Sequence, residues 1–177
     1  MTRALCVESH APESSLALGC TIGKRLKCGD VVALWGELGA GKTWLTQGIA
    51  RGLGIPAETP ITSPTFTIIN EYEGRLRLYH MDGYRIGDLE EMETLPWREA
   101  LFGHGVAVVE WPERLGSLLP AARLDIFLEI LGPTSRRLRV VFHTEELERR
   151  FADVFHGLED SLELIEEHEK AALTAPS

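Results

Sequence analysis

A glycine-rich segment that contains a lysine and a threonine carries the clearest chemical signal in the sequence. Residues 36–43 read GELGAGKT and match the G-x-x-x-x-G-K-[ST] pattern of a phosphate-binding loop. Glycines let backbone N–H groups approach phosphate oxygens, and the start of a following helix adds partial positive charge. We therefore expect a nucleotide to bind at Gly36, Glu37, Leu38, Gly39, Ala40, Gly41, Lys42 and Thr43.

Two side chains of this loop have separate expected roles. Lys42 should reach the β and γ phosphates, and the hydroxyl of Thr43 should bind Mg²⁺. The alternative is a glycine-rich turn with a solvated lysine. A predicted buried strand before the loop and a predicted helix after it favour the phosphate-binding interpretation.

Hydrolysis needs acidic groups in addition to this loop, and two carboxylates stand at the ends of predicted strands. Asp82 ends the run LYHMD, and Glu110 ends the run VAVVE. Ligand sites in open α/β sheets lie at the carboxyl ends of strands, so both carboxylates could reach one Mg²⁺. The predicted catalytic residues are Lys42, Asp82 and Glu110, and the predicted metal ligands are Thr43, Asp82 and Glu110. A solvated strand-end carboxylate is an equal alternative for either acid, and the division of roles between them stays open.

Other residues near these strands give weaker signals. Ser63 and Thr65, in the segment SPTFT, could form a switch-like loop that senses the γ phosphate, although a proline turn that enters a strand is the favoured alternative. Trp111 could lie against the base or the ribose, or could be an ordinary core residue. His80 could carry a proton, but a packed, hydrogen-bonded histidine is more common in a strand.

The hydrophobic pattern predicts an α/β fold, a phosphate-loop NTPase-like mixed sheet with a parallel core and antiparallel hairpins, flanked by helices. An exposed loop is expected over residues 55–64, because that segment contains three prolines and several hydroxyl residues. Strands are predicted at 4–8, 31–35, 66–72, 76–81, 106–109, 124–131 and 137–142, and helices at 14–26, 43–53, parts of 89–102 with an interruption at Pro96, and 145–172.

Length and composition fit one globular unit. The chain has 177 residues and a formal net charge of −9, with 27 acidic and 18 basic residues. We expect a phosphate-loop domain over 1–144 and an acidic helical extension over 145–177 that packs on or trails the same domain. This acidity disfavours a broad nucleic-acid or membrane surface. No apolar run approaches the ~18 residues of a spanning helix, so a cytoplasmic location is the default.

Four segments, in this order, resemble the TsaE ATPases of bacterial tRNA threonylcarbamoyladenosine synthesis. They are residues 36–43 (GELGAGKT), 62–67 (TSPTFT), 79–85 (YHMDGYR) and 110–115 (EWPERL). Many proteins share the phosphate-binding loop, but the other three segments at these separations are specific when they occur together. The resemblance covers roughly residues 4–143.

The resemblance implies an Mg²⁺-dependent ATPase that works with two partner proteins, TsaB and TsaD. Together they would form the threonylcarbamoyl modification at adenosine 37 of tRNAs that read codons beginning with A. The transfer chemistry would belong to TsaD, and this chain would meet tRNA only indirectly, through the complex. Carried over by position, Lys42 binds phosphate, Thr43 and Glu110 approach Mg²⁺, and Asp82 is the acid of the third segment. Thr65 would belong to a mobile loop, and Trp111 and Arg136 would lie near the nucleotide.

The sequence departs from the family pattern in three places. Trp44 replaces a second hydroxyl residue, Gly83 replaces a leucine and could loosen the backbone beside Asp82, and the C-terminal helix is expected to be longer than usual. Two other classes of protein remain as alternatives, a small nucleotide or metabolite kinase and a nucleotide-gated binding module. A GTPase is excluded, because the only asparagine, Asn70, is not followed by the lysine of an N-K-x-D segment.

Overall fold

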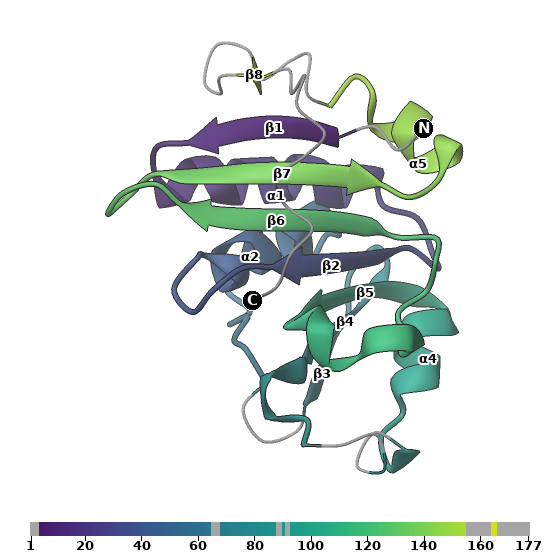
Figure 1. The fold of residues 1–177 in the computed structure, drawn as a ribbon. Helices are drawn as coiled ribbons and strands as arrows, with labels where there is room; N and C mark the ends of the chain where they lie inside the picture. Colours follow the sequence, from purple (N-terminus) through teal and green to yellow (C-terminus); the bar gives the residue numbers. More distant parts are fainter. Residues whose placement is uncertain (1–3, 65–67, 88–89, 91–92, 155–163, 166–177) are drawn as a thin grey trace.

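One mixed β-sheet organises the molecule (Figure 1). The computed structural model describes residues 4–64, 68–87, 90, 93–154 and 164–165. The strands follow the spatial order β3-β4-β5-β2-β6-β7-β1-β8. Their bounds are β1 Ala4–Ser9, β2 Val31–Trp35, β3 Ile69–Tyr72, β4 Arg77–Asp82, β5 Gly105–Glu110, β6 Leu124–Ile130, β7 Arg136–Phe142 and β8 Leu164–Ile165. The α-helices are α1 Pro12–Arg25, α2 Lys42–Gly52, α4 Trp97–Phe102 and α5 Glu145–Phe151. Within the described residues, short 3₁₀ helices are η1 Gly83–Arg85, η2 Pro112–Arg114 and η3 Gly116–Leu118.

The centre of the sheet is parallel and its flanks are antiparallel. Strand β2 pairs in parallel with β5 on one side and with β6 on the other, and β5 pairs in parallel with β4. The pairs β3–β4, β6–β7 and β7–β1 are antiparallel. Every residue of β5 is buried, as expected for a central strand covered on both faces. The predicted mixed sheet with a parallel core and antiparallel hairpins is confirmed.

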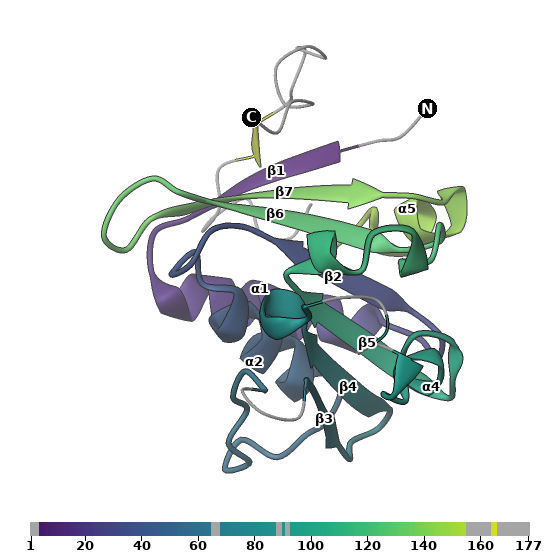
Figure 2. The same ribbon diagram turned by 60° about the horizontal axis from the view of Figure 1, so that its bottom comes forward.

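Helices cover both faces of this sheet. In β5, Val106 and Val108 point into the core cluster that contains residues of α1 and α2. Ala107 and Val109, at the alternate positions, belong to the second cluster together with Trp97 of α4. Because successive side chains of a strand point to opposite faces, α1 and α2 lie on one face and α4 on the other. Figures 1 and 2 show α1 and α2 side by side along the same face.

Helices α1 and α2 run parallel and approach at a row of glycines, a feature that the hydrophobic pattern does not predict. A Cβ added at Gly19 would lie 2.5 Å from the carbonyl oxygen of Leu45, and one added at Gly48 would lie 2.2 Å from that of Leu16. Gly23 and Gly52 meet one turn further along. This close packing sets the start of α2, and therefore the phosphate-binding loop, against the start of α1.

Replacing Gly48 with alanine is expected to lower the free energy of unfolding by about 1–3 kcal/mol, the usual cost of overpacking. The added methyl group would press on the backbone of α1, and the better helix propensity of alanine offsets only part of that cost. Urea unfolding followed by circular dichroism measures the difference. Gly132→Ala is the matched control, because its Cβ would meet only the Ser135 side chain at 4.0 Å. Equal or higher stability of Gly48→Ala would contradict the close approach.

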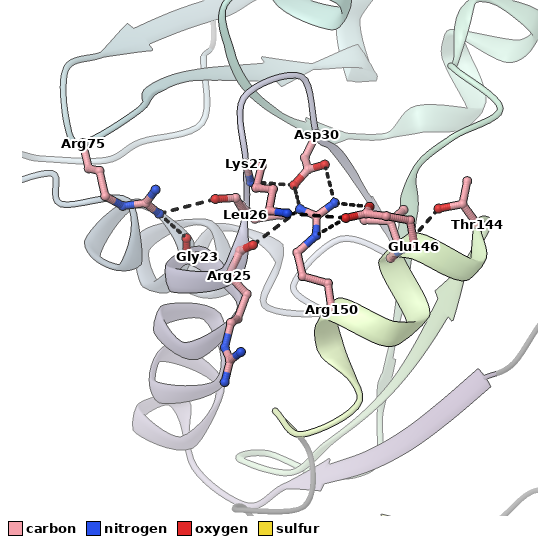
Figure 3. A network of polar contacts seen from close by, with 10 residues as sticks. Gly23, Arg25, Leu26, Lys27, Asp30, Arg75, Thr144, Glu146 and Arg150 are labelled. Carbon is pink, nitrogen blue, oxygen red and sulfur yellow. Dashed lines mark hydrogen bonds and ion pairs between the residues drawn. The ribbon is translucent and has the colours of Figure 1, made fainter.

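Arginine side chains join the segments at the opposite end of β2 from the loop (Figure 3). Arg150 of α5 binds Asp30, Glu146 and, at 3.4 Å, the carbonyl oxygen of Arg25. Arg75 donates to the carbonyl oxygens of Gly23 and Leu26 at the end of α1, at 3.1 and 3.5 Å. These contacts fix α5 to the residues just before the central strand and fix the β3–β4 turn to the end of α1.

The helix predicted over 145–172 is shorter in the structure. Helix α5 begins after Thr144, whose hydroxyl accepts from the N–H of Leu147 at 3.2 Å, and it ends at Phe151. Leu164–Ile165 forms β8, which pairs with β1 at the edge of the sheet. Charged composition favours helix only weakly, and a packed apolar face decides its length. Here that face consists of Leu147 and Phe151, both buried in the core cluster that also contains Val154. Residues 155–163 and 166–177 lie outside the described part.

The remaining boundaries agree closely with the sequence pattern. Strand β2 has the predicted bounds, and α2 is displaced by one residue from the predicted helix. Pro96 caps the start of α4, as its predicted interruption implies. Among the described helices, none has both the length and the apolar character needed to cross a membrane.

Candidate functional site

The glycine-rich segment forms the turn between β2 and α2, as the motif requires. Strand β2 ends at Trp35 and α2 begins at Lys42. Gly39 and Gly41 have positive φ angles of 80° and 101°, a conformation that residues with a Cβ rarely adopt. The turn therefore depends on glycine at these positions, and it ends at the N-terminus of α2.

Lys42 is buried at the centre of the site. Its ammonium donates to the carbonyl oxygens of Gly36 at 2.6 Å and Glu37 at 2.9 Å, and lies 4.3 Å from the centroid of the Trp111 ring. Burial lowers the pKa of Lys42, and the neighbouring Glu110 carboxylate acts in the opposite direction. A buried cation of this kind is stabilised by an anion, so the position suits a phosphate group.

Glu110 connects the loop to the end of β5. The carboxylate is buried, with only 3% of the residue exposed. Its Oε1 lies 2.8 Å from Nε2 of His80, 3.4 Å from the hydroxyl of Thr46 and 3.5 Å from that of Thr43. The hydroxyl of Ser63 lies 3.5 Å from Oε2 and 2.8 Å from the Thr43 hydroxyl. The structure thus gathers three hydroxyl groups and one carboxylate beside the phosphate-binding loop.

Asp82 is the direct neighbour of Glu110 in the sheet. The two residues are paired in the parallel register of β4 and β5, so their side chains leave the same edge. Burial raises the pKa of Asp82, partly offset by the N–H of Tyr84 at 2.9 Å, and the nearby Glu110 charge raises it further. Two carboxylates placed together in a partly buried site favour a bound cation.

The oxygen ligands at this site suit Mg²⁺ that is shared with a bound phosphate, and they are too few for a metal ion held by protein side chains alone. The described residues contain no group of three or more His, Cys, Asp or Glu side chains arranged around a metal. Mg²⁺ usually takes one or two carboxylates together with phosphate oxygens and water. The Thr43 hydroxyl with Glu110 and Asp82 provides such a partial set, which a triphosphate would complete.

A cavity of about 530 Å³ joins these groups. All the predicted site residues lie in or beside it except Thr65, which falls outside the described residues. The lining includes Gly39, Gly41, Lys42, Thr43, Ser63, Asp82, Glu110, Trp111 and Arg136. Its size is within the usual range for a site that holds a small ligand.

Arg136 supports the loop from the β6–β7 hairpin. Its guanidinium donates to the carbonyl oxygens of Ala40 at 3.0 Å and Gly39 at 3.1 Å. It also donates to those of Gly132 at 2.8 Å and Ser135 at 2.9 Å. The structure therefore gives Arg136 a contact with the loop backbone, more specific than the predicted position near the nucleotide.

Arg136→Lys is expected to raise the Kd for ATP about tenfold, because lysine cannot span the carbonyl groups of loop and hairpin together. Isothermal titration calorimetry measures the effect. Arg137→Lys is the matched control, since Arg137 contacts Glu8 and Glu129 on the neighbouring strands. Unchanged affinity in a folded Arg136→Lys protein would show that the loop keeps its shape without this side chain.

Trp111 lies at the cavity with a constrained backbone, so it is not an ordinary core residue. Its φ angle is +54°, in the left-handed region that is uncommon for a tryptophan. Its ring packs against Tyr84 with centroids 5.0 Å apart. A Cβ on Gly83 would lie 2.5 Å from the Trp111 carbonyl oxygen, so Gly83 permits a close contact here, in contrast to the expected loosening of the backbone.

Two supporting residues had only weak sequence signals. His80 is fully buried and bonded to Glu110, which agrees with a packed histidine and gives it a specific partner. Thr46 is not part of the phosphate-loop pattern, although it follows Lys42 by one helical turn of α2. Its hydroxyl donates to the Lys42 carbonyl at 2.9 Å and also reaches Glu110. That spacing on a helix that leaves a phosphate-binding loop is the signal that could have identified it.

Comparison with known proteins gives consistent results. The family described as "Threonylcarbamoyl adenosine biosynthesis protein TsaE" matches residues 9–138. The tRNA threonylcarbamoyladenosine biosynthesis protein TsaE of Treponema pallidum is 44% identical over 135 residues, which cover 76% of this chain and 98% of that protein. The protein of the same name from Bacillus subtilis is 45% identical over 128 residues, covering 72% and 78%. A crystal structure of Bacillus subtilis YdiB superposes with a TM-score of 0.74 and 35% identity, covering 89% of this chain and 97% of that one.

Proposed function

Because this chain belongs to the TsaE family of threonylcarbamoyl adenosine biosynthesis proteins, we propose that it hydrolyses ATP, with Mg²⁺, in the formation of threonylcarbamoyladenosine in tRNA. Its relatives carry the name of that modification. The role in forming the modified nucleoside follows from membership of the family. ATP hydrolysis is the contribution that the residues of the site support.

One observation carries the hydrolytic proposal: a phosphate-binding loop and two strand-end carboxylates share a single cavity. Lys42 and the N-terminus of α2 would hold the β and γ phosphates and neutralise charge that develops on the γ phosphoryl group. Thr43, Glu110 and Asp82 would hold Mg²⁺, which supplies electrostatic stabilisation of the phosphate oxygens.

The carboxylates also suit the activation of water. One of Asp82 and Glu110 would orient a water molecule for in-line attack on the γ phosphorus. A bond forms between the water oxygen and phosphorus, the bond to the β-phosphate oxygen breaks, and ADP and phosphate leave. His80 fixes the Glu110 carboxylate through the 2.8 Å contact, so Glu110 is the better oriented of the two acids.

We further propose that TsaB and TsaD are the partner proteins and that tRNA is met through that complex in the cytoplasm. The net charge of −9 supports indirect contact with tRNA, because direct binding to phosphate backbones relies on basic surfaces. Hydrolysis by this chain would then drive or reset the complex.

Steady-state ATP hydrolysis measured with and without purified TsaB and TsaD tests this proposal, with modified tRNA counted in the same reactions. We expect the partners to stimulate turnover and repeated tRNA modification to require ATP and this chain. Turnover that stays negligible with partners present would support a passive nucleotide-gated module. Phosphate transfer to a small acceptor would instead identify a kinase.

A further inference from the structure

The cavity has two chemically different sides, separated by the phosphate-binding loop. In the sheet, β5 and β4 lie on one side of β2 and carry Glu110 and Asp82. Strands β6 and β7 lie on the other side, and their connecting turn contributes Pro133 and Thr134 to the lining. The first side is acidic, whereas the second contributes no carboxylate to the lining.

Trp44 lies in the first turn of α2, directly after Thr43. Gly19 meets Gly48 and Gly23 meets Gly52, and the same offset along the parallel helices places Ser15 beside Trp44. Both Ser15 and Trp44 line the cavity. Trp44 therefore belongs to the side away from the carboxylates, where α1 begins.

Trp44 leaves 46% of its surface exposed, which is high for so large an apolar residue. Each of the other three tryptophans has an aromatic or cationic neighbour: Trp35 stacks on Phe127, Trp97 contacts Phe102, and Trp111 contacts Lys42. No ring or cation contact joins Trp44 to another residue of the described ranges. Its indole face is thus available to a ligand in the cavity.

The position of the γ phosphate determines on which side of the cavity the nucleoside of a bound triphosphate lies. If the γ phosphate lies beside Glu110, as the proposed function requires, the nucleoside must extend toward the opposite side, which has no carboxylate in its lining. Arg136 lies on that side, but its guanidinium already donates hydrogen bonds to four backbone carbonyl groups. A flat aromatic surface is the remaining feature suited to a base.

We propose that Trp44 is the stacking platform for the nucleotide base, an inference that rests on the proposed function. Stacking acts on the π face that all bases share, so Trp44 would strengthen the binding of ADP and GDP similarly. Its contribution is affinity for the nucleoside, and it takes no part in the reaction at the γ phosphate.

Calorimetric titration of the full chain with ADP and with pyrophosphate tests the assignment. Trp44→Thr should raise the Kd of ADP about tenfold, because loss of base stacking on an aromatic side chain weakens binding by roughly this factor. The Kd of pyrophosphate, which has no base, should stay unchanged. Trp44→Phe should stay within about threefold of the parent for ADP, because it keeps an aromatic face. Phe102→Ala removes an aromatic residue that is 63% exposed and outside the cavity lining, and serves as the control.

The outcomes separate this inference from the proposed function. An unchanged Kd of ADP in Trp44→Thr would overturn the platform, as would an equal loss for ADP and pyrophosphate, which would mean that Trp44 shapes the loop. If the parent chain binds ADP and Lys42→Ala does not, either result would leave the proposed function intact. Failure of the parent chain to bind ADP and pyrophosphate would overturn both proposals.

Discussion

Lys42→Ala is expected to lower kcat/KM for ATP hydrolysis roughly 10²- to 10³-fold, the usual effect of removing one preorganised donor from a developing charge. The ammonium is buried beside Glu110 and is held by two carbonyl groups of its own loop. It can therefore meet a phosphate oxygen with little reorganisation. Hydrolysis assays in the presence of TsaB and TsaD, with calorimetric binding of ATP, measure the loss.

Two further variants test whether the loss comes from the specific position and shape of the Lys42 ammonium. Lys42→Arg keeps the charge but replaces a compact ammonium with a larger planar group, so most of the activity should still be lost. Lys24→Ala removes an exposed lysine from the last turn of α1 and should leave activity within about twofold. Thermal unfolding of each variant is the check that it is folded. Full activity in Lys42→Ala would remove the phosphate-binding role of the loop.

Glu110→Gln is expected to reduce kcat by roughly 10²-fold or more, the range for losing a positioned acid or base, with a much smaller effect on nucleotide binding. The amide has nearly the same shape, so the contacts of His80 and Thr46 can persist while the negative charge is lost. A charge that binds Mg²⁺ or orients water is needed in the reaction, whereas the loop binds the phosphates.

The dependence of this variant on Mg²⁺ distinguishes the two roles of the acid. If Glu110 binds the metal directly, Glu110→Gln should need more Mg²⁺ for half-maximal turnover. If it orients water, kcat should fall with the Mg²⁺ requirement unchanged. Glu113→Gln makes the same change of charge at an exposed residue near Lys42 and should be nearly silent. Parent-level turnover in Glu110→Gln would exclude both roles.

Local patterns were sufficient to predict the centre of the site. The apolar run of β2, the glycine-rich loop and the helix α2 are contiguous, so their sequence specifies their relative placement directly. Asp82 and Glu110 are far apart in the chain, but each ends a strand of the parallel core. The rule that such ends share one edge was enough to bring them together.

Contacts between segments far apart in the chain were harder to predict from the sequence. The pairing of β1 with β7 joins segments from opposite ends of the described chain, such as Ala4 and Val141, and no local residue pattern specifies it. The contact of Arg136 with the loop depends on the position of a hairpin turn, which no residue pattern specifies. Helix α5 was overextended in the prediction because charged residues continue beyond Phe151, while the packed apolar face that stabilises a helix ends nearby.

Arg136 donates to two carbonyl groups of the loop and two of the β6–β7 hairpin, so the conformation of the loop is energetically coupled to the position of the hairpin. The hairpin also exposes Ile130 and Leu131 near its tip. Thermodynamic coupling of this kind is reciprocal. A macromolecule that binds the hairpin more tightly when ATP is bound must increase the affinity for ATP by the same factor. Binding of ATP and binding at the hairpin would then each strengthen the other.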